Sequence, residues 1–150
     1  MKALLQRVSG ASVSVDDDEE VGRVGRGLVV FVGVAADDTD KDVRYLVPKM
    51  IDLRIFPDEG GRFNLSLLDI GGEVLIVSQF TLLADTRKGR RPSFTGAAPP
   101  EQAEALFEQF VEQARASGLK VATGRFQQYM RVEIHNDGPV TIMLDSRDKF

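Results

Sequence analysis

A short polar segment directly follows an apolar, strand-like run in the middle of the chain. Residues 74–77 (VLIV) are apolar, and residues 78–82 read SQFTL. The ends of buried strands are where α/β folds often place binding and catalytic groups. The hydroxyl and amide side chains there could contact a ligand, or they could simply satisfy one another at a strand end. Both interpretations stay open on these residues alone.

A second polar segment, residues 136–141 (NDGPVT), lies between two strand-like stretches. Asn, Asp, Gly and Pro favour turns, so a plain turn is one interpretation. An X-Pro bond can adopt the cis form at a cost of only roughly 0.5–1 kcal/mol. The Gly138-Pro139 pair could therefore also orient two backbone carbonyls in an unusual way.

Basic residues concentrate in residues 87–92 (RKGRRP) of an otherwise acidic chain. The cations are Arg87, Lys88, Arg90 and Arg91. Clustered arginine and lysine side chains neutralise phosphate oxygens. We expect a loop that is either merely solvated or in contact with phosphates.

The composition excludes several other chemistries. The chain has no cysteine and one histidine, which excludes disulfides, zinc-thiolate sites, cysteine nucleophiles and a multi-histidine metal site within one chain. The histidine, His135, follows the apolar alternation of Met130, Val132 and Ile134 and so falls on the polar face of its predicted strand. We expect it to be solvated, and we expect no metal and no cofactor.

These segments need a scaffold, and hydrophobic periodicity predicts a single α/β domain with a mixed sheet and two main helices. Thr39 and Asp42 form a capping-box pattern before the first helix, in which Pro48 should cause a kink or an early end. The second helix should begin near residues 99–100 (PP) and end at Gly118. Strands are expected at residues 11–15, 28–34, 53–56, 73–83, 120–123, 130–135 and 140–144. The acidic run 16–20 should form a hairpin tip, and residues 145–148 a polar tail.

Charge and hydropathy limit the partners and the compartment. The chain of 150 residues has a formal net charge of -4, which argues against a general nucleic-acid binder but not against a local basic patch. No apolar run reaches the roughly 20 residues needed to cross a bilayer. The N-terminus shows no signal-peptide pattern. We expect a soluble cytoplasmic protein that binds neither membrane nor DNA.

Taken together, these segments resemble the D-aminoacyl-tRNA deacylases of the DTD family. The resemblance runs from residues 6–8 (QRV) to 144–146 (LDS), and it includes 53–56 (LRIF), 64–69 (NLSLLD) and 84–94 (ADTRKGRRPSF). The hallmark motifs are SQFTL and NDGPVT. Each motif alone is modest evidence, but the two at family-like separation, in a chain of family length, are specific. The SQF form favours the D-specific branch.

The resemblance implies a fold and an activity. The fold would be one domain spanning residues 1–150, with a barrel-like core. The enzyme would hydrolyse the ester between a D-amino acid and the 3′-terminal adenosine of tRNA, and would also remove glycine mischarged on tRNA for alanine. It would be a homodimer with its site at the subunit interface, where a cis Gly138-Pro139 pair from one subunit enters the site of the other. Its two carbonyls would hold the substrate ammonium group, so that an L side chain would strike the backbone.

The resemblance also assigns roles to single residues. Arg7 would hold the Gly-Pro carbonyls, and Ser78 would help bind the substrate. Gln79, Phe80 and Thr81 would form the catalytic segment, with backbone N–H groups of the last two stabilising the oxyanion. A nucleophilic Thr81 hydroxyl is disfavoured because no histidine or cysteine lies nearby in sequence to activate it. The ribose 2′-OH of the terminal adenosine would instead help activate water.

Two further groups would contact the tRNA. Phe126 and Met130 match positions that form the adenine pocket in the family. Apolar surfaces suit base stacking, which supports this role. Core packing is the alternative. The basic residues of the segment 87–91 would contact tRNA phosphates.

Two other functions remain open on the sequence. The first is a tRNA-binding or editing module without catalysis of its own. The second is a small-molecule hydrolase that uses Thr81 or Ser78 as nucleophile, which predicts activity on simple D-amino-acid esters that lack the ribose.

Overall fold

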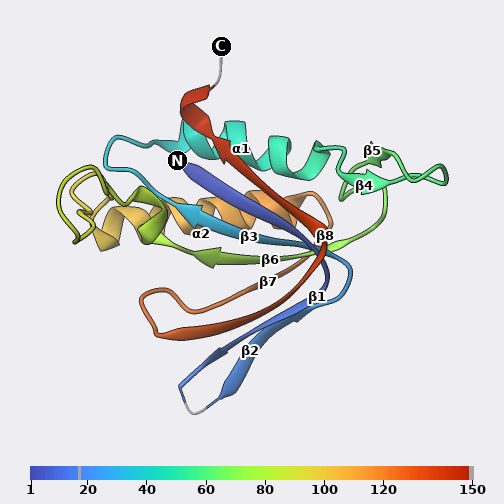
Figure 1. The fold of residues 1–150 in the computed structure, drawn as a ribbon, viewed down its shortest axis with the longest axis horizontal. Helices are drawn as coiled ribbons and strands as arrows, with labels where there is room; N and C mark the ends of the chain where they lie inside the picture. The colour runs from blue at the N-terminus through green and yellow to red at the C-terminus, as the bar shows by residue number, and fades with distance from the viewer. Residues whose placement is uncertain (17, 149–150) are drawn as a thin grey trace.

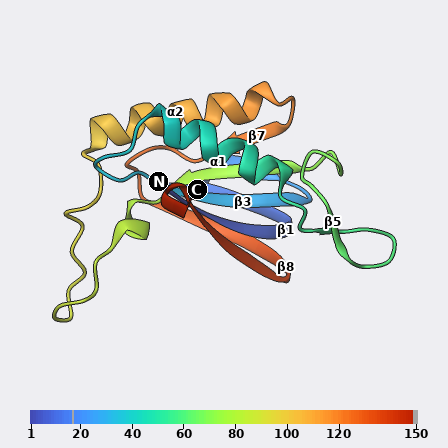
Figure 2. The same cartoon turned by 90° about the horizontal axis from the view of Figure 1, so that it is seen from above.

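The fold is one mixed six-stranded sheet with two helices packed on one face (Figures 1 and 2). The computed structural model describes residues 1–16 and 18–148. The strand order is β2-β1-β3-β6-β7, and β8 pairs with β1. The sheet strands are β1 (Lys2–Val15), β2 (Glu19–Val24), β3 (Gly27–Gly33), β6 (Glu73–Ser78), β7 (Lys120–Thr123) and β8 (Met130–Asp145). β3 pairs in parallel with β6, and β6 with β7, whereas β1 pairs antiparallel with β2, β3 and β8.

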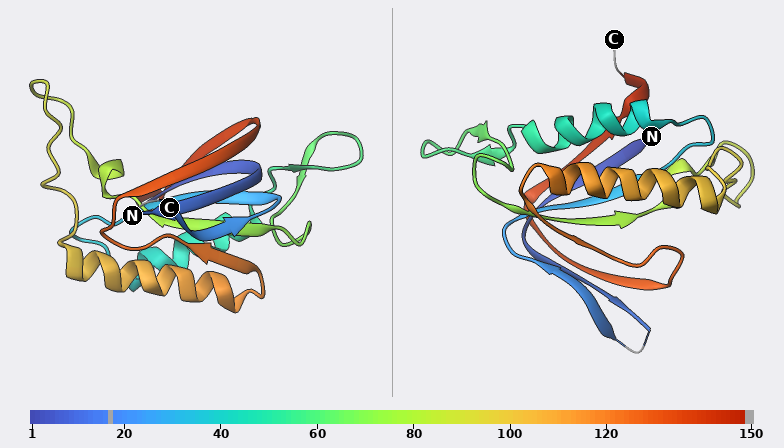
Figure 3. Two further views of the ribbon diagram at one scale, coloured as in Figure 1. Left: turned by 90° about the horizontal axis from the view of Figure 1, so that it is seen from below. Right: turned by 180° about the vertical axis from the view of Figure 1, so that it is seen from behind.

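The remaining elements cover or extend this sheet. The helices are α1 (Asp40–Asp52) and α2 (Pro100–Ala116), and two short 3-10 helices are η1 (Phe80–Leu83) and η2 (Ser146–Asp148). A small separate hairpin consists of β4 (Phe56–Pro57) and β5 (Phe63–Leu65). The long strands β1 and β8 curl the sheet into a nearly barrel-like shape, as Figure 3 shows. The predicted mixed α/β fold with two main helices is confirmed.

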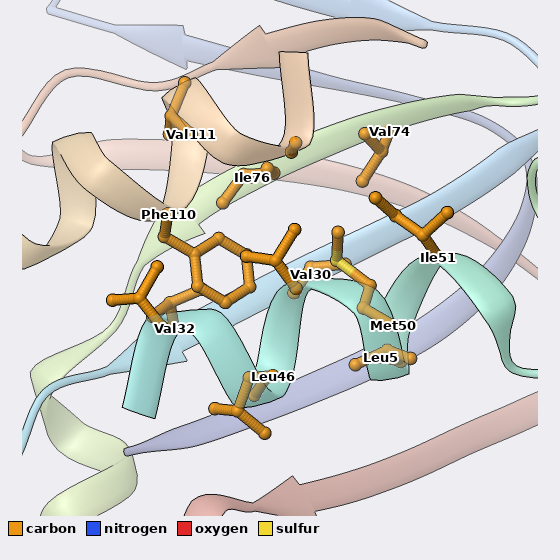
Figure 4. Packing of buried hydrophobic residues seen from close by; sticks show 14 of the residues in the cluster. Leu5, Val30, Val32, Leu46, Met50, Ile51, Val74, Ile76, Phe110 and Val111 are labelled. Carbon is orange, nitrogen blue, oxygen red and sulfur yellow. The ribbon is translucent and has the colours of Figure 1, made fainter. Parts of the chain in front are cut away.

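Two apolar clusters hold the sheet from its two faces. Between the sheet and the helices, Phe110 of α2 and Leu46 of α1 are fully buried and meet Val30 and Val32 of β3 (Figure 4). Inside the curl of the sheet, a second cluster includes Val13, Val29 and Leu75. β3 is therefore buried on both sides, as its unbroken apolar run predicts. The neighbouring β6 pairs with β3 over its whole length, from Glu73 to Ser78.

The first helix begins as predicted but does not end early. Thr39 and Asp42 form a capping box, in which the Thr39 amide donates to Asp42 Oδ2 at 2.8 Å. Of the two effects predicted for Pro48, a kink or an early end, the early end is wrong, because α1 continues to Asp52. Pro48 and Arg44 are exposed, so water can satisfy the Arg44 carbonyl that the proline leaves without an amide partner.

Two predicted strands are shorter than expected. Of residues 53–56, only Phe56 belongs to a strand, because the Ile55 carbonyl accepts a hydrogen bond from Arg7 Nη1 at 2.8 Å instead of joining a ladder. The predicted strand 73–83 ends at Ser78, and the chain then turns into η1. The break places residues 78–81 at the C-terminal end of β6, which lies between β3 and β7.

The predicted strands 130–135 and 140–144 are a single strand, β8. Both halves pair antiparallel with β1, so the chain does not reverse between them. Asn136 faces Val8 and Thr141 faces Gln6, which leaves residues 137–140 opposite Arg7 alone. A plain turn is therefore the wrong interpretation of the Gly138-Pro139 segment, which is a bulge within one strand.

Asp16 and Asp18 lie between β1 and β2, as predicted for a hairpin tip, whereas Glu19 and Glu20 begin β2. Asp17 lies outside the described residues. His135 is exposed, as its place in the alternation predicts. Among the residues that the structure describes, no helix is long and apolar enough to span a membrane.

The prediction of a polar tail at residues 145–148 agrees with the exposure of Arg147 and Asp148 but is wrong for Ser146. Ser146 is fully buried, and its hydroxyl accepts a hydrogen bond from the Met1 ammonium group at 2.9 Å. The same hydroxyl donates to Asp42 Oδ1 at 2.6 Å. The ammonium group also pairs with Asp38 Oδ1 at 2.8 Å. This buried network ties the two ends of the described chain to the start of α1.

Candidate active site

A cavity of about 660 Å³ opens at the end of β6, within the size range of small-molecule sites. Three segments line it: the end of β6, the approach to α2, and the connection from β7 to β8. Its wall includes five of the predicted site residues, which are Ser78, Gln79, Phe80, Phe126 and Met130. The structure thus brings the predicted catalytic segment and the predicted adenine pocket together.

The predicted catalytic segment presents backbone donors beside this cavity. The Gln79 amide still donates to the Val32 carbonyl at 2.8 Å, and η1 begins at the next residue. Because the first amides of a helix have no acceptor within it, the N–H groups of Phe80 and Thr81 are free of the helix's own hydrogen bonds. The Thr81 hydroxyl accepts a hydrogen bond from Gln79 Nε2. Thr81 itself is not one of the residues that line the cavity.

Aromatic side chains form part of the cavity wall. The Phe126 ring lies 6.3 Å from that of Phe107, and the Phe80 ring meets that of Phe94 edge-on at 5.0 Å. Phe94 and Tyr129 also line the cavity, and sequence analysis did not single them out. Their signals were present, since Phe94 closely follows the basic run and Tyr129 directly precedes Met130.

The Gly138-Pro139 pair lies in a second cluster, held by a buried arginine. Their peptide bond is cis, and Gly138 has φ +133°, a region that L side chains rarely adopt. Arg7 Nε donates to the Asp137 carbonyl at 3.1 Å, while Arg7 Nη1 donates to the Ile55 carbonyl. The Phe63 ring lies 5.5 Å from the guanidinium carbon. A planar guanidinium is suited to fixing two carbonyls from different segments at once.

Side chains on β8 close the bulge from its other side. Asn136 Oδ1 accepts from the Val140 amide at 3.1 Å, and Asn136 Nδ2 donates to Thr141 Oγ1 at 3.0 Å. Gln6 Nε2 donates to the same hydroxyl at 3.2 Å. Sequence analysis assigned no role to Asn136, whose turn-favouring side chain was the available signal. The bulge is therefore fixed by side-chain hydrogen bonds at both of its ends.

The two clusters are far apart within one chain. Arg7 pairs with Leu28 of β3, and Ser78 pairs with Val32, four residues along the same strand, which is about 13 Å. From β8 to β6 there are three strand spacings, or about 14 Å. Measured along the sheet, the bulge and the end of β6 thus lie roughly 20 Å apart. Arg7, Gly138 and Pro139 accordingly take no part in the cavity wall.

The basic segment lies on a loop that extends away from the body of the protein (Figures 2 and 3). Two backbone hydrogen bonds between Asp85 and Ser93, of 2.8 and 2.9 Å, close its base. Arg87 Nη2 pairs with Asp85 Oδ2 at 2.7 Å, and hydrogen bonds from Arg87 lower the pKa of Asp85 to about 2. Lys88, Arg90 and Arg91 are exposed. Arg87 thus stabilises the loop, and the other three cations face solvent.

No group of three His, Cys, Asp or Glu side chains that could hold a metal ion occurs within residues 1–16 and 18–148. The chemistry that the described residues offer is hydrogen bonding from backbone groups, aromatic contact and exposed positive charge at the loop.

Comparison with known proteins gives consistent matches over the whole chain. A family model described as D-Tyr-tRNA(Tyr) deacylase matches residues 4–145. Similar sequences include proteins named D-aminoacyl-tRNA deacylase from Syntrophobacter fumaroxidans, Dehalococcoides mccartyi and Thermotoga petrophila. They are 55%, 60% and 57% identical to this chain over 150 residues, and each match covers 100% of this chain and at least 97% of the relative.

Two solved structures have the same fold. One, named "c-Myc DNA Unwinding Element Binding Protein", is similar with a TM-score of 0.90 and 44% identity, over 97% of this chain and 98% of that one. The other, described as a probable eukaryotic D-amino acid tRNA deacylase, has a TM-score of 0.86 and 22% identity, over 95% and 97% of the two chains.

Proposed function

The chain belongs to the D-aminoacyl-tRNA deacylases, hydrolases that act on aminoacyl-tRNA ester bonds, and we propose that it performs this hydrolysis at a site built from two subunits. The cavity beside β6 of one subunit binds the terminal adenosine and the ester. The Gly138-Pro139 pair of the second subunit binds the substrate ammonium group. Each subunit is a single domain, residues 1–150, that acts in the cytoplasm, where translation takes place.

The separation of the two clusters is the observation that supports a two-chain site. In an aminoacyl ester, the carbonyl carbon and the ammonium nitrogen are only two bonds apart. The N–H groups of Phe80 and Thr81 must reach the first, and the carbonyls of Gly138 and Pro139 must reach the second. A gap of roughly 20 Å within one chain is too long for that. A two-fold symmetric dimer can place the bulge of one subunit against the cavity of the other, twice.

Handedness would be sensed by backbone atoms. With the ester and the ammonium group both fixed, the side chain of a D-amino acid points to open space, whereas an L side chain would strike the bulge. Such a steric test is blind to side-chain type, which suits one pocket that serves many amino acids. Glycine has no side chain to reject, so glycine mischarged on tRNA for alanine is also a substrate.

Catalysis would depend on the backbone and on the RNA. The amides of Phe80 and Thr81 stabilise the oxyanion, and one such donor typically contributes on the order of 10²–10³ in rate. The Thr81 hydroxyl is engaged by Gln79 Nε2, and the one histidine, His135, is far from it in sequence, so it is a poor nucleophile. The ribose 2′-OH of the terminal adenosine helps activate the attacking water.

The remaining contacts bind the tRNA. The terminal adenine lies against Phe126 and Met130, which both line the cavity. Arg87, Lys88, Arg90 and Arg91 contact phosphates from the extended loop. The binding of DNA that one structural neighbour's name mentions is not extended to this chain, because its net charge of -4 argues against a general nucleic-acid binder.

Deacylation assays with matched substrates test the proposal. We expect hydrolysis of D-tyrosyl-tRNA and glycyl-tRNA, no hydrolysis of L-tyrosyl-tRNA, and loss of activity when the terminal 2′-OH is replaced by hydrogen. A simple ester of D-tyrosine should be left intact. Efficient cleavage of that simple ester would instead favour a small-molecule hydrolase, and tRNA binding without any cleavage would favour a binding module.

A further inference from the structure

Tyr129 is unusually exposed for an aromatic residue at the wall of a cavity. Tyr129 is 90% exposed, whereas the next most exposed large hydrophobic residues within the described chain, Phe63 and Phe80, are 57% exposed. It nevertheless lines the cavity beside Phe126 and Met130. It lies on the connection between β7 and β8, directly before the first residue of β8. An aromatic side chain held in water at the rim of a site is available to a ligand that extends beyond it.

We infer that Tyr129 is a stacking platform for the cytosine base of the nucleotide that precedes the terminal adenosine; the inference rests on the proposed function. Every tRNA ends in cytidine, cytidine and adenosine as a single strand. When the adenosine and its amino acid fill the cavity, the preceding nucleotide must lie at the rim. Proteins recognise unpaired RNA bases by stacking them on aromatic side chains.

The other groups at this rim are less suited to the role. The Phe94 ring already packs edge-on against Phe80 and is only partly exposed. The arginines on either side of the segment are engaged, because Arg125 pairs with Glu19 at 3.2 Å and Arg131 with Asp18 at 2.9 Å. These pairs partly neutralise the local charge. What the segment offers an approaching nucleotide is therefore the free face of the Tyr129 ring.

The spacing of Phe126 and Tyr129 along the protein also suits two adjacent nucleotides of the tRNA. Phe126 and Tyr129 belong to one segment, so a base against Phe126 and the next base against Tyr129 would lie in consecutive places along the same wall. Gln127 has a left-handed backbone, with φ +64°, and this local bend separates the two aromatic residues. Contact with the cytosine would lengthen the recognised substrate from one nucleotide to two.

A tRNA that lacks only the cytosine base tests the inference. We would compare kcat/KM for D-tyrosyl-tRNA with that for the same tRNA carrying an abasic ribose before the terminal adenosine, for the wild type, Tyr129→Ala and Tyr129→Phe. Because one stacked base contributes about 1–3 kcal/mol, the wild type should lose at least about fivefold on the abasic substrate. Tyr129→Ala should lose as much on the normal substrate and be insensitive to the missing base, and Tyr129→Phe should behave as the wild type.

The outcomes separate this inference from the proposed function. A wild type that hydrolyses both substrates equally well, or a Tyr129→Ala variant that remains sensitive to the missing base, would overturn the stacking role and leave the deacylase activity intact. A wild type that hydrolyses neither would refute the proposed function and the inference with it. Unchanged unfolding temperatures of the variants would exclude a folding defect.

Discussion

Replacing Arg7 by lysine perturbs the Gly138-Pro139 bulge without touching the cavity. The guanidinium donates to two carbonyls from separate segments, those of Asp137 and Ile55. A lysine ammonium group is a single point charge and cannot occupy both positions. Arg7→Lys therefore retains the positive charge but leaves one of the two carbonyls without its donor.

The expected magnitudes follow from those contacts. Arg7 is buried, and an unsatisfied buried acceptor costs about 1–3 kcal/mol. In a chain of this size that lowers the unfolding temperature by roughly 2–12 °C. If the displaced bulge loses one hydrogen bond to the substrate ammonium group, about 1.5–3 kcal/mol, kcat/KM on D-tyrosyl-tRNA falls roughly 10- to 150-fold.

Thermal unfolding and initial deacylation rates measure the two effects separately. Arg54→Lys is the matched control, because Arg54 also donates to two acceptors, on Asn64, but is exposed. It should change stability by less than about 1 kcal/mol. An Arg7→Lys variant that loses stability but keeps its full rate and its discrimination against L-tyrosyl-tRNA would refute the positioning role of Arg7.

Three further variants probe the hydroxyl, the buried network and the basic loop. Thr81→Ala should keep deacylase activity within about tenfold of the wild type, because the backbone donor remains; initial rates at background level would restore the nucleophile model. Asp38→Ala should lower the free energy of unfolding by about 3–5 kcal/mol, since it leaves the N-terminal ammonium group buried without its carboxylate. Urea denaturation measures this loss, and Asp37→Ala, which removes only an exposed ion pair, should cost less than about 1 kcal/mol. The double variant Arg90→Ala and Arg91→Ala should weaken tRNA binding and flatten its dependence on salt concentration; binding equal to that of the wild type at every salt concentration would remove these residues from the interface.

Local patterns in the sequence were sufficient for much of the scaffold. The apolar run at residues 28–34 predicts a strand covered on both faces, and β3 is buried throughout. The capping pattern of Thr39 and Asp42 predicts the first residue of α1, and the positive φ of Gly118 follows from its place after α2. These features depend on neighbours within a few residues, which is the range over which capping and periodicity act.

Three of the errors occurred where a distant partner decides the structure. Residues 136–141 contain strong turn formers, yet both flanking stretches pair with β1, more than a hundred residues away in sequence. The Ile55 carbonyl accepts a hydrogen bond from Arg7 instead of pairing in a strand. The buried Ser146 hydroxyl accepts a hydrogen bond from the N-terminal ammonium group. None of these partners is visible in a local window of sequence.

The candidate site divides in the same way. The motif residues 78–80 could be placed at a strand end because an apolar run precedes them, and the cavity lies there. The only sequence signal for the rim residue Tyr129 was its place directly before Met130, because its exposure depends on how the connection between β7 and β8 folds. The distance between the bulge and the cavity is likewise set by the order of the strands, which composition and periodicity do not determine.

Paired variants in one dimer test the two-subunit site most directly. Phe80→Pro removes one oxyanion donor at the first position of η1, where proline is tolerated. Gly138→Val displaces the bulge, since even a Cβ there would lie 2.9 Å from Val140 Cγ2 and 3.2 Å from Arg7 Nη2. Each variant alone should be nearly inactive on D-tyrosyl-tRNA.

The measurement is the activity of the mixed dimer, purified by two different affinity tags after coexpression. In such a dimer one site carries both defects and the other site carries neither. We expect the mixed dimer to recover about half of the wild-type rate. A mixed dimer that is as inactive as its two parents would contradict a site in which one chain supplies the cavity and its partner the bulge.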